Sequence, residues 1–466
     1  MQIPILSGIW TDARADFRSE YPRNLIPIVA PTGINTSYLR PADGIVAQGT
    51  GPGVSRGGIE WDGVLYRVLG TKLCRIDASG AVTVLGDIPG TDRVTMVYSF
   101  DYLAIAGGGG LYFYDGSTLT QNTDPDLGTV LDVIWVDGYF LTTDGEFLVI
   151  TELNNPFAVD PFKYGSSEVD PDPVKAIVKL RNEVYALNRH TVEVFQNTGQ
   201  TGFPFERVPG AQLQRGVIGT HCVTVFLEQI AFLGSGQNEA PGVWLGGNGN
   251  TAKISTREVD LILAEYTEAE LATAFFETRV DRNYQHLVMH LPRKTLVYDG
   301  AASQVLSEPV WFCLSTSLDG STPWRSQSLV WAYNRWNTAD TTSPALGYLT
   351  DTVSTQWGQT VGWQFQTSII YNDSRGAIVH TLELVALPGR VALGEDPRIS
   401  TQYSLDGVTW SQPKWIAAGK IGDRAKRLQW LQQGAFRNWR VQRFAGTSDA
   451  YLSVARLEAQ LEGLAW

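Results

Sequence analysis

The sequence has few residues of the types that build metal, cofactor and disulfide sites. Its 466 residues include three cysteines and five histidines. Cys74, Cys222 and Cys313 are odd in number and far apart, which favours buried free thiols over a disulfide or a metal site. Only His286 and His290 form a close pair, and strand spacing separates them by about 13 Å, too far for one metal ion. We therefore expect no metal centre and no cofactor.

Long apolar runs and a leader pattern are also missing. No run of about 18 apolar residues occurs, so we expect no membrane insertion. The opening stretch, MQIPILSGIWTDARADF, has no basic residues before its short apolar segment and does not indicate a signal peptide. We expect synthesis in a cytoplasm.

A β-unit that recurs about every 40 to 50 residues is the main feature that is present. The clearest copies span Gly58–Asp77, Val94–Asp115, Val130–Thr151 and Val174–Gln196, and looser copies span Gly219–Gly246, Ala274–Asp299 and Ser328–Asp351. One such meander leaves an apolar face and two strand edges uncovered, and radial stacking covers them. The pattern predicts an all-β protein with a six- or seven-bladed β-propeller.

Changes in pattern divide the chain. Residues 1–52 are rich in Pro and Gly and predict an extended N-terminal arm that lies on a neighbour. The repeats fill residues 53–357, and longer alternating strands from 358 to 466 predict an antiparallel β-sandwich. Within Ser255–Glu277, Thr267 and Glu270 form a T-x-x-E capping box, so we expect two short inserted helices there.

The motif search finds no catalytic residues. GTGPGVSRGG (Gly49–Gly58) lacks the G-K-[S/T] ending of a phosphate-binding loop, and no nucleophile or zinc-protease motif occurs. Ser404–Trp410 (SLDGVTW) and Ser317–Trp324 (SLDGSTPW) approach the Asp box of sialidase propellers, but that motif braces a hairpin. A glycosidase needs two positioned carboxylates, which the sequence does not identify. A sialidase-like glycosidase or a glycan-binding propeller stays open as an alternative.

Charge is distributed unevenly along the chain. Between Arg390 and Arg443 there are ten Lys/Arg and four Asp/Glu, a balance of +6, which leaves −18 for the rest of a chain whose net charge is −12. An acidic body argues against a surface that grips DNA phosphates. The basic C-terminal patch consists of Arg424, Lys426, Arg427, Arg437, Arg440 and Arg443. We favour a solvated sheet face or docking on an acidic protein over DNA binding.

Several segments carry a resemblance to one family. GVSRGGIEWDGVLYRVLGTKL (Gly53–Leu73), RGVIGTHCVTVFLEQIAFLGS (Arg215–Ser235), the run Ser255–Asp299 and YPRNLIPIVAPTGINTSYLRPADGI (Tyr21–Ile45) resemble the packaged-DNA stabilisation proteins of short-tailed bacteriophages. Those are the tail hub or nozzle subunits. The most specific strings are G-V-S-R-G at Gly53–Gly57 and H-L-P-R-x-x-L-V-Y-D at His290–Asp299. The resemblance weakens after about Trp311 and is poor in the sandwich, which could then serve a different receptor-binding apparatus.

The resemblance implies a structural virion protein and not an enzyme. It implies a hexameric ring of subunits below the portal and its adaptor, which retains packaged DNA and conducts it during ejection without sequence-specific binding. The expected neighbours are the portal–adaptor protein, the tail needle or plug, and tailspike or fibre proteins, and the expected location is the virion tail after synthesis in the bacterial host cytoplasm. We assign the adaptor-side contact to Tyr21, Pro22, Asn24, Leu25, Tyr38 and Leu39. A glycosidase carried on the virion is the corresponding alternative.

Overall fold

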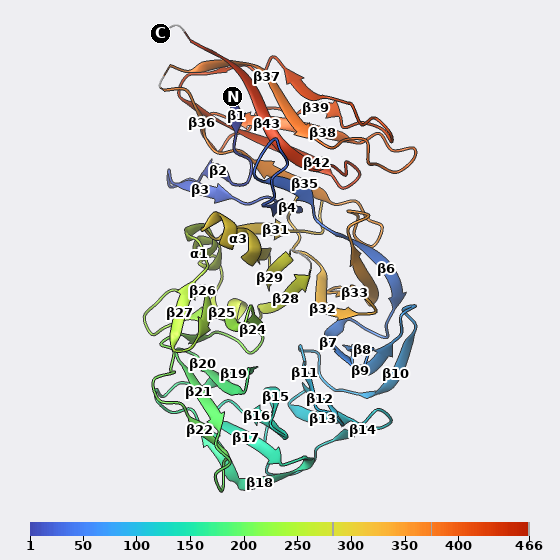
Figure 1. Cartoon of the computed structure of the whole chain (residues 1–466), viewed down its shortest axis with the longest axis vertical. Coiled ribbons are helices and arrows are strands. Elements are labelled where there is room, and N and C mark those ends of the chain that lie inside the picture. Colours follow the sequence, from blue (N-terminus) through green and yellow to red (C-terminus); the bar gives the residue numbers. More distant parts are fainter. Residues whose placement is uncertain (282–283, 374, 465–466) are drawn as a thin grey trace.

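The chain forms a ring of β-sheets with a β-sandwich beside it (Figure 1). The computed structural model describes residues 1–281, 284–373 and 375–464. The expected all-β fold, a propeller followed by an antiparallel sandwich, is confirmed, and the ring has seven blades. Positions 282–283 of the expected propeller range and positions 374 and 465–466 of the expected sandwich range lie outside the described residues.

Each blade is an antiparallel meander, and the seven repeat segments found in the sequence fall in seven separate blades. Blade 1 contains β7 (Ser55–Trp61), β8 (Val64–Leu69), β9 (Lys72–Ile76) and β10 (Val82–Asp87), and blade 2 contains β11 (Thr95–Tyr98), β12 (Leu103–Gly107), β13 (Gly110–Tyr114) and β14 (Leu119–Gln121). Blade 3 contains β15 (Asp132–Val136), β16 (Tyr139–Thr143), β17 (Phe147–Glu152) and β18 (Asn155–Ser166), and blade 4 contains β19 (Val174–Leu180), β20 (Glu183–Asn188), β21 (Val192–Asn197) and β22 (Phe205–Arg207).

The remaining blades follow the same plan. Blade 5 contains β23 (Gly216–Val217), β24 (Val223–Phe226), β25 (Gln229–Ser235), β26 (Gly242–Gly247) and β27 (Asn250–Lys253). Blade 6 contains β28 (Phe275–Asp281), β29 (Tyr284–His290), β30 (Thr295–Asp299) and β31 (Val310–Leu314), and blade 7 contains β32 (Ser326–Ala332), β33 (Arg335–Asp340), β34 (Ala345–Thr350) and β6 (Gly44–Thr50).

Local sequence explains the blades. Asp137 and Gly138 form the two-residue turn between β15 and β16 with φ of 48° and 88°, values that a turn of type I′ needs and that Gly and Asp tolerate. Apolar residues on the sheet faces pack between neighbouring blades: the rings of Phe113 in blade 2 and Phe140 in blade 3 lie 4.9 Å apart. Each sheet face is therefore buried by the next blade.

The ring closes with a strand from the N-terminal segment. β6 pairs antiparallel with β34, with Ile45 opposite Leu349 and Val46 opposite Tyr348. The outer strand of the last blade thus comes from residues that precede the first blade. This pairing covers a strand edge and joins the two ends of the repeat array, as closed sheet rings require.

The N-terminal segment folds into the chain instead of extending away from it, which differs from the expected arm. Besides β6 it contains β1 (Gln2–Ile3), β2 (Gly8–Thr11), β3 (Phe17–Glu20), β4 (Leu25–Ile28) and β5 (Tyr38–Pro41). β1, β4 and β5 belong to a sandwich sheet. The physical reason is burial, since Ile3, Leu25 and Leu39 lie in the sandwich core. Strand pairing therefore crosses the boundary expected at residue 52.

The sandwich has two sheets around an aromatic core. One sheet contains β4, β5, β43 (Val454–Gly463), β37 (Ala377–Ala386) and β40 (Leu428–Leu431), with β1 and β41 (Ala435–Phe436) paired at its side. The other contains β35 (Gly362–Gln366), β42 (Trp439–Thr447), β38 (Arg398–Ser404) and β39 (Lys414–Ala417), with β36 (Ile370–Tyr371) paired to β42. The Phe444 ring packs against Phe365 at 5.2 Å and Trp430 at 5.4 Å.

Among the residues that the structure describes, three short helices interrupt the strands. α1 (Arg257–Leu263) and α2 (Glu268–Leu271) are the two inserted helices that the sequence predicts, and the Thr267–Glu270 capping box is present. α3 (Gly300–Leu306) connects β30 to β31 and was not expected. Its N-cap, Asp299, accepts a hydrogen bond from the Ala302 N–H. A single capping residue after an uninterrupted strand pattern is too weak a signal to predict a helix of this length.

Candidate functional surfaces

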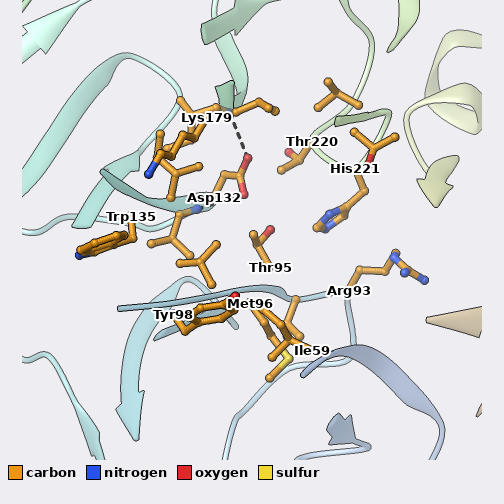
Figure 2. A pocket seen from close by; sticks show the side chains of 18 of the residues that line it. Ile59, Arg93, Thr95, Met96, Tyr98, Asp132, Trp135, Lys179, Thr220 and His221 are labelled. Carbon is orange, nitrogen blue, oxygen red and sulfur yellow. Dashed lines mark hydrogen bonds between the residues drawn. The ribbon is translucent and has the colours of Figure 1, made fainter. Parts of the chain in front are cut away.

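The propeller encloses a central channel. It has a volume of about 690 Å³ and is lined by the inner strands and by the segments next to them. Figure 2 shows the polar side chains of Thr95, Asp132, Thr220 and His221 pointing toward the same space, with Arg93 nearby. A concave space with converging polar groups is where bound ligands and reactions are expected, so its chemistry must be considered first.

Asp132 holds two blades together. Its carboxylate accepts hydrogen bonds from the N–H of Val133 in blade 3 and of Ile177 in blade 4, both at 3.0 Å. Burial raises the pKa of Asp132 to about 6, while these hydrogen bonds act in the opposite direction. Both carboxylate oxygens accept hydrogen bonds from backbone N–H groups, and these bonds connect blades 3 and 4.

His221 is a weak base in its surroundings. Burial and the nearby Arg93 lower the pKa of His221 to about 4, so the imidazole is neutral at pH 7. In the part of the chain that the structure describes, no group of three or more His, Cys, Asp or Glu side chains is arranged to hold a metal ion. The channel therefore offers polar walls without a recognisable reaction centre.

The two histidines noted in the sequence lie on β29 and face different carboxylates. His286 Nε2 is 3.4 Å from Asp299 Oδ2, and His290 Nε2 is 3.6 Å from Glu277 Oε2. Glu277 Oε1 also forms an ion pair with Arg93 at 3.2 Å and accepts a hydrogen bond from the Ser328 N–H at 2.5 Å. Burial alone would raise the pKa of Glu277, but His290, Arg93 and this N–H lower it to about 2. The cluster is a buried charge network that joins blades 6 and 7.

The Asp-box-like motifs brace turns, as expected. Asp406 accepts hydrogen bonds from the Thr409 hydroxyl and from the N–H groups of Thr409 and Val408, and these bonds hold its pKa well below the usual range. Hydrogen bonds from the N–H and hydroxyl of Ser321 lower the pKa of Asp319 to about 2. The carboxylates are consumed in turn geometry and do not form a catalytic pair.

The residues assigned to an adaptor contact lie largely inside this chain. Pro22, Asn24, Leu25 and Leu39 are buried, whereas Tyr21 and Tyr38 are half-buried. A side chain that is buried within its own chain presents no surface to a partner, so this part of the assignment is corrected. Tyr21 and Tyr38 keep accessible surface and stay candidate contacts.

Asn24 shows what this region does instead. Its side-chain nitrogen donates to the carbonyls of Ser315 at 3.0 Å and Gly362 at 2.8 Å, and its side-chain oxygen accepts from the Ser315 N–H at 2.9 Å. Ser315 follows blade 6, and Gly362 begins the sandwich strand β35. Asn24 therefore connects the two domains. This role could not be predicted from the sequence, because Ser315 and Gly362 are about 300 positions away from Asn24 in the chain.

A second contact joins the domains at α1. The β2–β3 hairpin lies beside sandwich strands β35 and β42. From it, Arg18 donates to both oxygens of Glu258 at 2.9 and 2.8 Å, and the Ser19 N–H donates to Glu258 at 3.1 Å. A bidentate, partly buried pair of this kind fixes orientation as well as distance.

The basic C-terminal patch divides into an exposed part and a buried part. Arg424, Lys426, Arg427 and Arg437 are exposed, but Arg440 is fully buried. Arg440 donates to the Gln433 carbonyl at 2.6 Å and lies over the Tyr403 ring. Arg443 is half-buried and lies over the Trp410 ring at 3.6 Å. Burial lowers the pKa of both arginines to about 10. Arg440 therefore supports the sandwich and does not belong to a surface patch, whereas Arg443 keeps accessible surface and stays a candidate contact.

Negative charge is concentrated in blades 2 and 3. Residues 99–172 contain thirteen Asp/Glu and one lysine, Lys163, a net charge equal to the −12 of the whole chain. Lys163 is paired with Glu152 at 2.6 Å and with Asp160 at 3.8 Å. The strongest negative surface therefore lies at the end of the long axis opposite the sandwich (Figure 1).

None of the helices in residues 1–281, 284–373 and 375–464 is long and apolar enough to cross a membrane.

Comparisons with known proteins bear on the whole chain. The tail hub protein gp10 of Salmonella phage P22 is 28% identical over 458 residues, covering 94% of each chain. Among solved structures, the chain is similar to PorZ, a surface component of the type-IX secretion system of Porphyromonas gingivalis, with 11% identity and a TM-score of 0.41 over 80% of this chain and 46% of PorZ. The computationally designed protein Ika8 is similar with 10% identity and a TM-score of 0.37 over 66% of this chain and 100% of Ika8.

Two family models match in succession. The model described as the bacteriophage P22 Gp10 β-propeller matches residues 1–354, and the model described as the P22 Gp10 β-sandwich matches residues 362–462. The sandwich, where the resemblance was expected to be poor, therefore has its own family match. The chain belongs, across both of its domains, to the bacteriophage P22 Gp10 family.

Proposed function

We propose that this chain is a structural subunit of a phage tail hub. The observation that carries the proposal is the similarity to a tail hub protein over 94% of both chains, with propeller and sandwich in the same order. The subunits form a hexameric ring in the virion tail, below the portal and its adaptor protein, after synthesis in the bacterial host cytoplasm. The tail needle or plug and the tailspikes or fibres are its further neighbours.

In this role the ring retains packaged DNA and later conducts it outward without sequence-specific binding. The charge of the chain supports a conduit, since a net charge of −12 repels DNA phosphates and keeps passing DNA from adhering. Part of the basic charge of the sandwich is paired within the chain, since Arg427 contacts Glu383 and Lys420 contacts Asp396. We infer that the basic residues contact protein and that acidic loops face the DNA path.

The geometry of the channel side chains supports a non-enzymatic role. The polar groups that converge there are held by backbone donors, as in Asp132, or are neutral, as in His221. In the Asp-box-like turns, the carboxylates accept hydrogen bonds from nearby backbone N–H groups. The similarity therefore points to assembly and not to glycan hydrolysis.

The test uses DNA-filled heads that lack this protein. Adding the purified chain is expected to seal them, measured as protection of the packaged DNA from nuclease and as a gain in infectivity after the remaining tail proteins are added. Heads that stay equally sensitive to nuclease contradict a hub role. Hydrolysis of host polysaccharide by the purified chain, lost when one carboxylate is neutralised, would support the glycosidase alternative.

A further inference from the structure

One surface combines negative charge with exposed aromatic rings. It lies on blade 3, and we call it the acidic face: Glu146, Glu152, Asp160 and Glu168 with Phe162 and Tyr164. Glu152 and Asp160 share Lys163, whereas Glu146 and Glu168 form no ion pair with a described residue. The Phe162 side chain is 86% exposed and that of Tyr164 is 52% exposed. Exposed aromatic residues surrounded by charge are typical of protein contact sites.

The acidic face favours contacts through side chains over the addition of another β-strand. Phe162 and Tyr164 lie on β18, the outermost strand of blade 3. β18 also contains Pro156 and Pro161, which lack an N–H and disfavour the addition of another strand. Phe147 pairs with Ser166 across the sheet. Glu146 directly precedes Phe147, and Glu168 is two residues after Ser166, so the two glutamates lie at the same end of this strand pair.

The opposite end of the molecule carries the complementary combination. Between residues 414 and 437 there are six Lys/Arg and one acidic residue, Asp423. The segment Lys420–Arg427, which we call the basic loop, connects β39 to β40 and is exposed throughout. The loop contains one exposed apolar side chain, Ile421 at 53%, and two others flank it, Trp415 at 56% and Leu431 at 65%.

The charges on the basic loop are available. Arg427 is paired with Glu383, and Lys420 lies 3.7 Å from Asp396. Arg424 and Lys426 form no ion pair with any residue that the structure describes. The two surfaces are therefore complementary in charge, and each presents apolar side chains that water does not solvate well.

We propose that the basic loop of one copy of this chain docks on the acidic face of another copy. The sandwich and blade 3 lie at opposite ends of the long axis, so one chain cannot bring its own two surfaces together (Figure 1). A second copy is the partner whose surface chemistry is known to fit. The contact joins two different surfaces, as in the head-to-tail contacts of rings. This proposal rests on the hub role and names the surfaces through which its subunits meet.

The test exchanges charges between the two surfaces in the full-length chain. One variant carries Glu146→Lys and Glu168→Lys, a second carries Arg424→Glu and Lys426→Glu, and a third carries all four changes. All four positions are exposed, and none of these side chains forms an ion pair with a described residue. The third variant keeps the net charge of the parent and restores opposite charges across the contact. Glu206→Lys with Glu308→Lys provides a control that changes the net charge by the same amount as the first variant, at exposed positions elsewhere.

The readout is the mass of assemblies formed by each variant alone at low salt and on purified portal–adaptor complexes. We expect the first two variants to assemble at least tenfold more weakly than the parent, and the third variant and the control to assemble like the parent. Thermal melting of each variant shows that it is folded. Equal assembly by all folded variants, or no recovery in the third, overturns the proposed contact and leaves the hub role standing. A parent chain that never assembles overturns both.

Discussion

Replacing Asn24 by alanine tests whether this residue connects the domains or contacts a partner. Asn24 is 5% exposed, and its side chain makes three hydrogen bonds to backbone groups of Ser315 and Gly362. Its φ of 54° lies in the left-handed region, which Asn tolerates better than Ala. The substitution therefore removes the hydrogen bonds and adds backbone strain.

The expected loss follows from these contacts. Three buried hydrogen bonds contribute about 1 kcal/mol each. The left-handed backbone adds about 1 kcal/mol for alanine but not for glycine. We therefore expect Asn24→Ala to lower the free energy of unfolding by about 4 kcal/mol and Asn24→Gly by about 3 kcal/mol. For the alanine variant of a unit the size of the sandwich, this corresponds to a fall of roughly 15 °C in melting temperature.

Scanning calorimetry is the assay, because it resolves the two domains. In the parent, the Asn24 contacts couple propeller and sandwich, and in the alanine variant we expect the sandwich transition to separate to lower temperature. Asn438→Ala, at an exposed position, is the control and should leave the transitions in place. A melting temperature for Asn24→Ala within 1 °C of the parent, with normal coupling, would refute the reasoning and return Asn24 to the candidate partner contacts.

Further predictions concern ring closure, the buried charges and the basic patch. Ile45→Ala removes a buried β6 side chain, costs about 3 kcal/mol, and should speed hydrogen exchange of the β34 amides, measured by mass spectrometry; unchanged exchange contradicts closure by β6. Because the folded pKa of Glu277 is about 2 against 4.5 for the free group, its stabilisation is complete above pH 4.5 and is lost as pH falls toward 2. Glu277→Gln should therefore flatten the acid limb of stability and cost about 3 kcal/mol at pH 7, and an unchanged acid limb would show that another group controls it. Arg440→Gln should cost about 3 kcal/mol whereas Arg437→Gln stays within 0.5 kcal/mol, since only Arg440 is buried; equal effects on melting would contradict this division.

The propeller was predictable because its signal is repeated. Each blade has alternating apolar residues on its strands and Gly or Asp at its turns, as in the Asp137–Gly138 hairpin. A repeat whose pattern is weak can therefore be identified from the clearer repeats. The closing strand was not predictable. β6 pairs with β34, about 300 positions away in the chain, and the sequence of β6 does not indicate which strand it pairs with.

The candidate site was less accessible to sequence reasoning. Proline and glycine in the first 52 residues indicate irregular structure, but they do not show that Leu25 and Leu39 enter the sandwich core. A run of basic residues predicts exposed charges. Arg424 is exposed as predicted, but the guanidinium of Arg440 is buried by tertiary packing. The acidic face was readable in part, since Phe162 stands in an acidic stretch, but its exposure depends on β18 being an outer strand.

The most direct test of the account is the mass of the purified chain, alone and after mixing with portal–adaptor complexes. A tail hub subunit is expected to add as a closed ring of copies on that platform. A chain that remains a monomer and leaves the mass of the complexes unchanged would contradict the tail hub assignment.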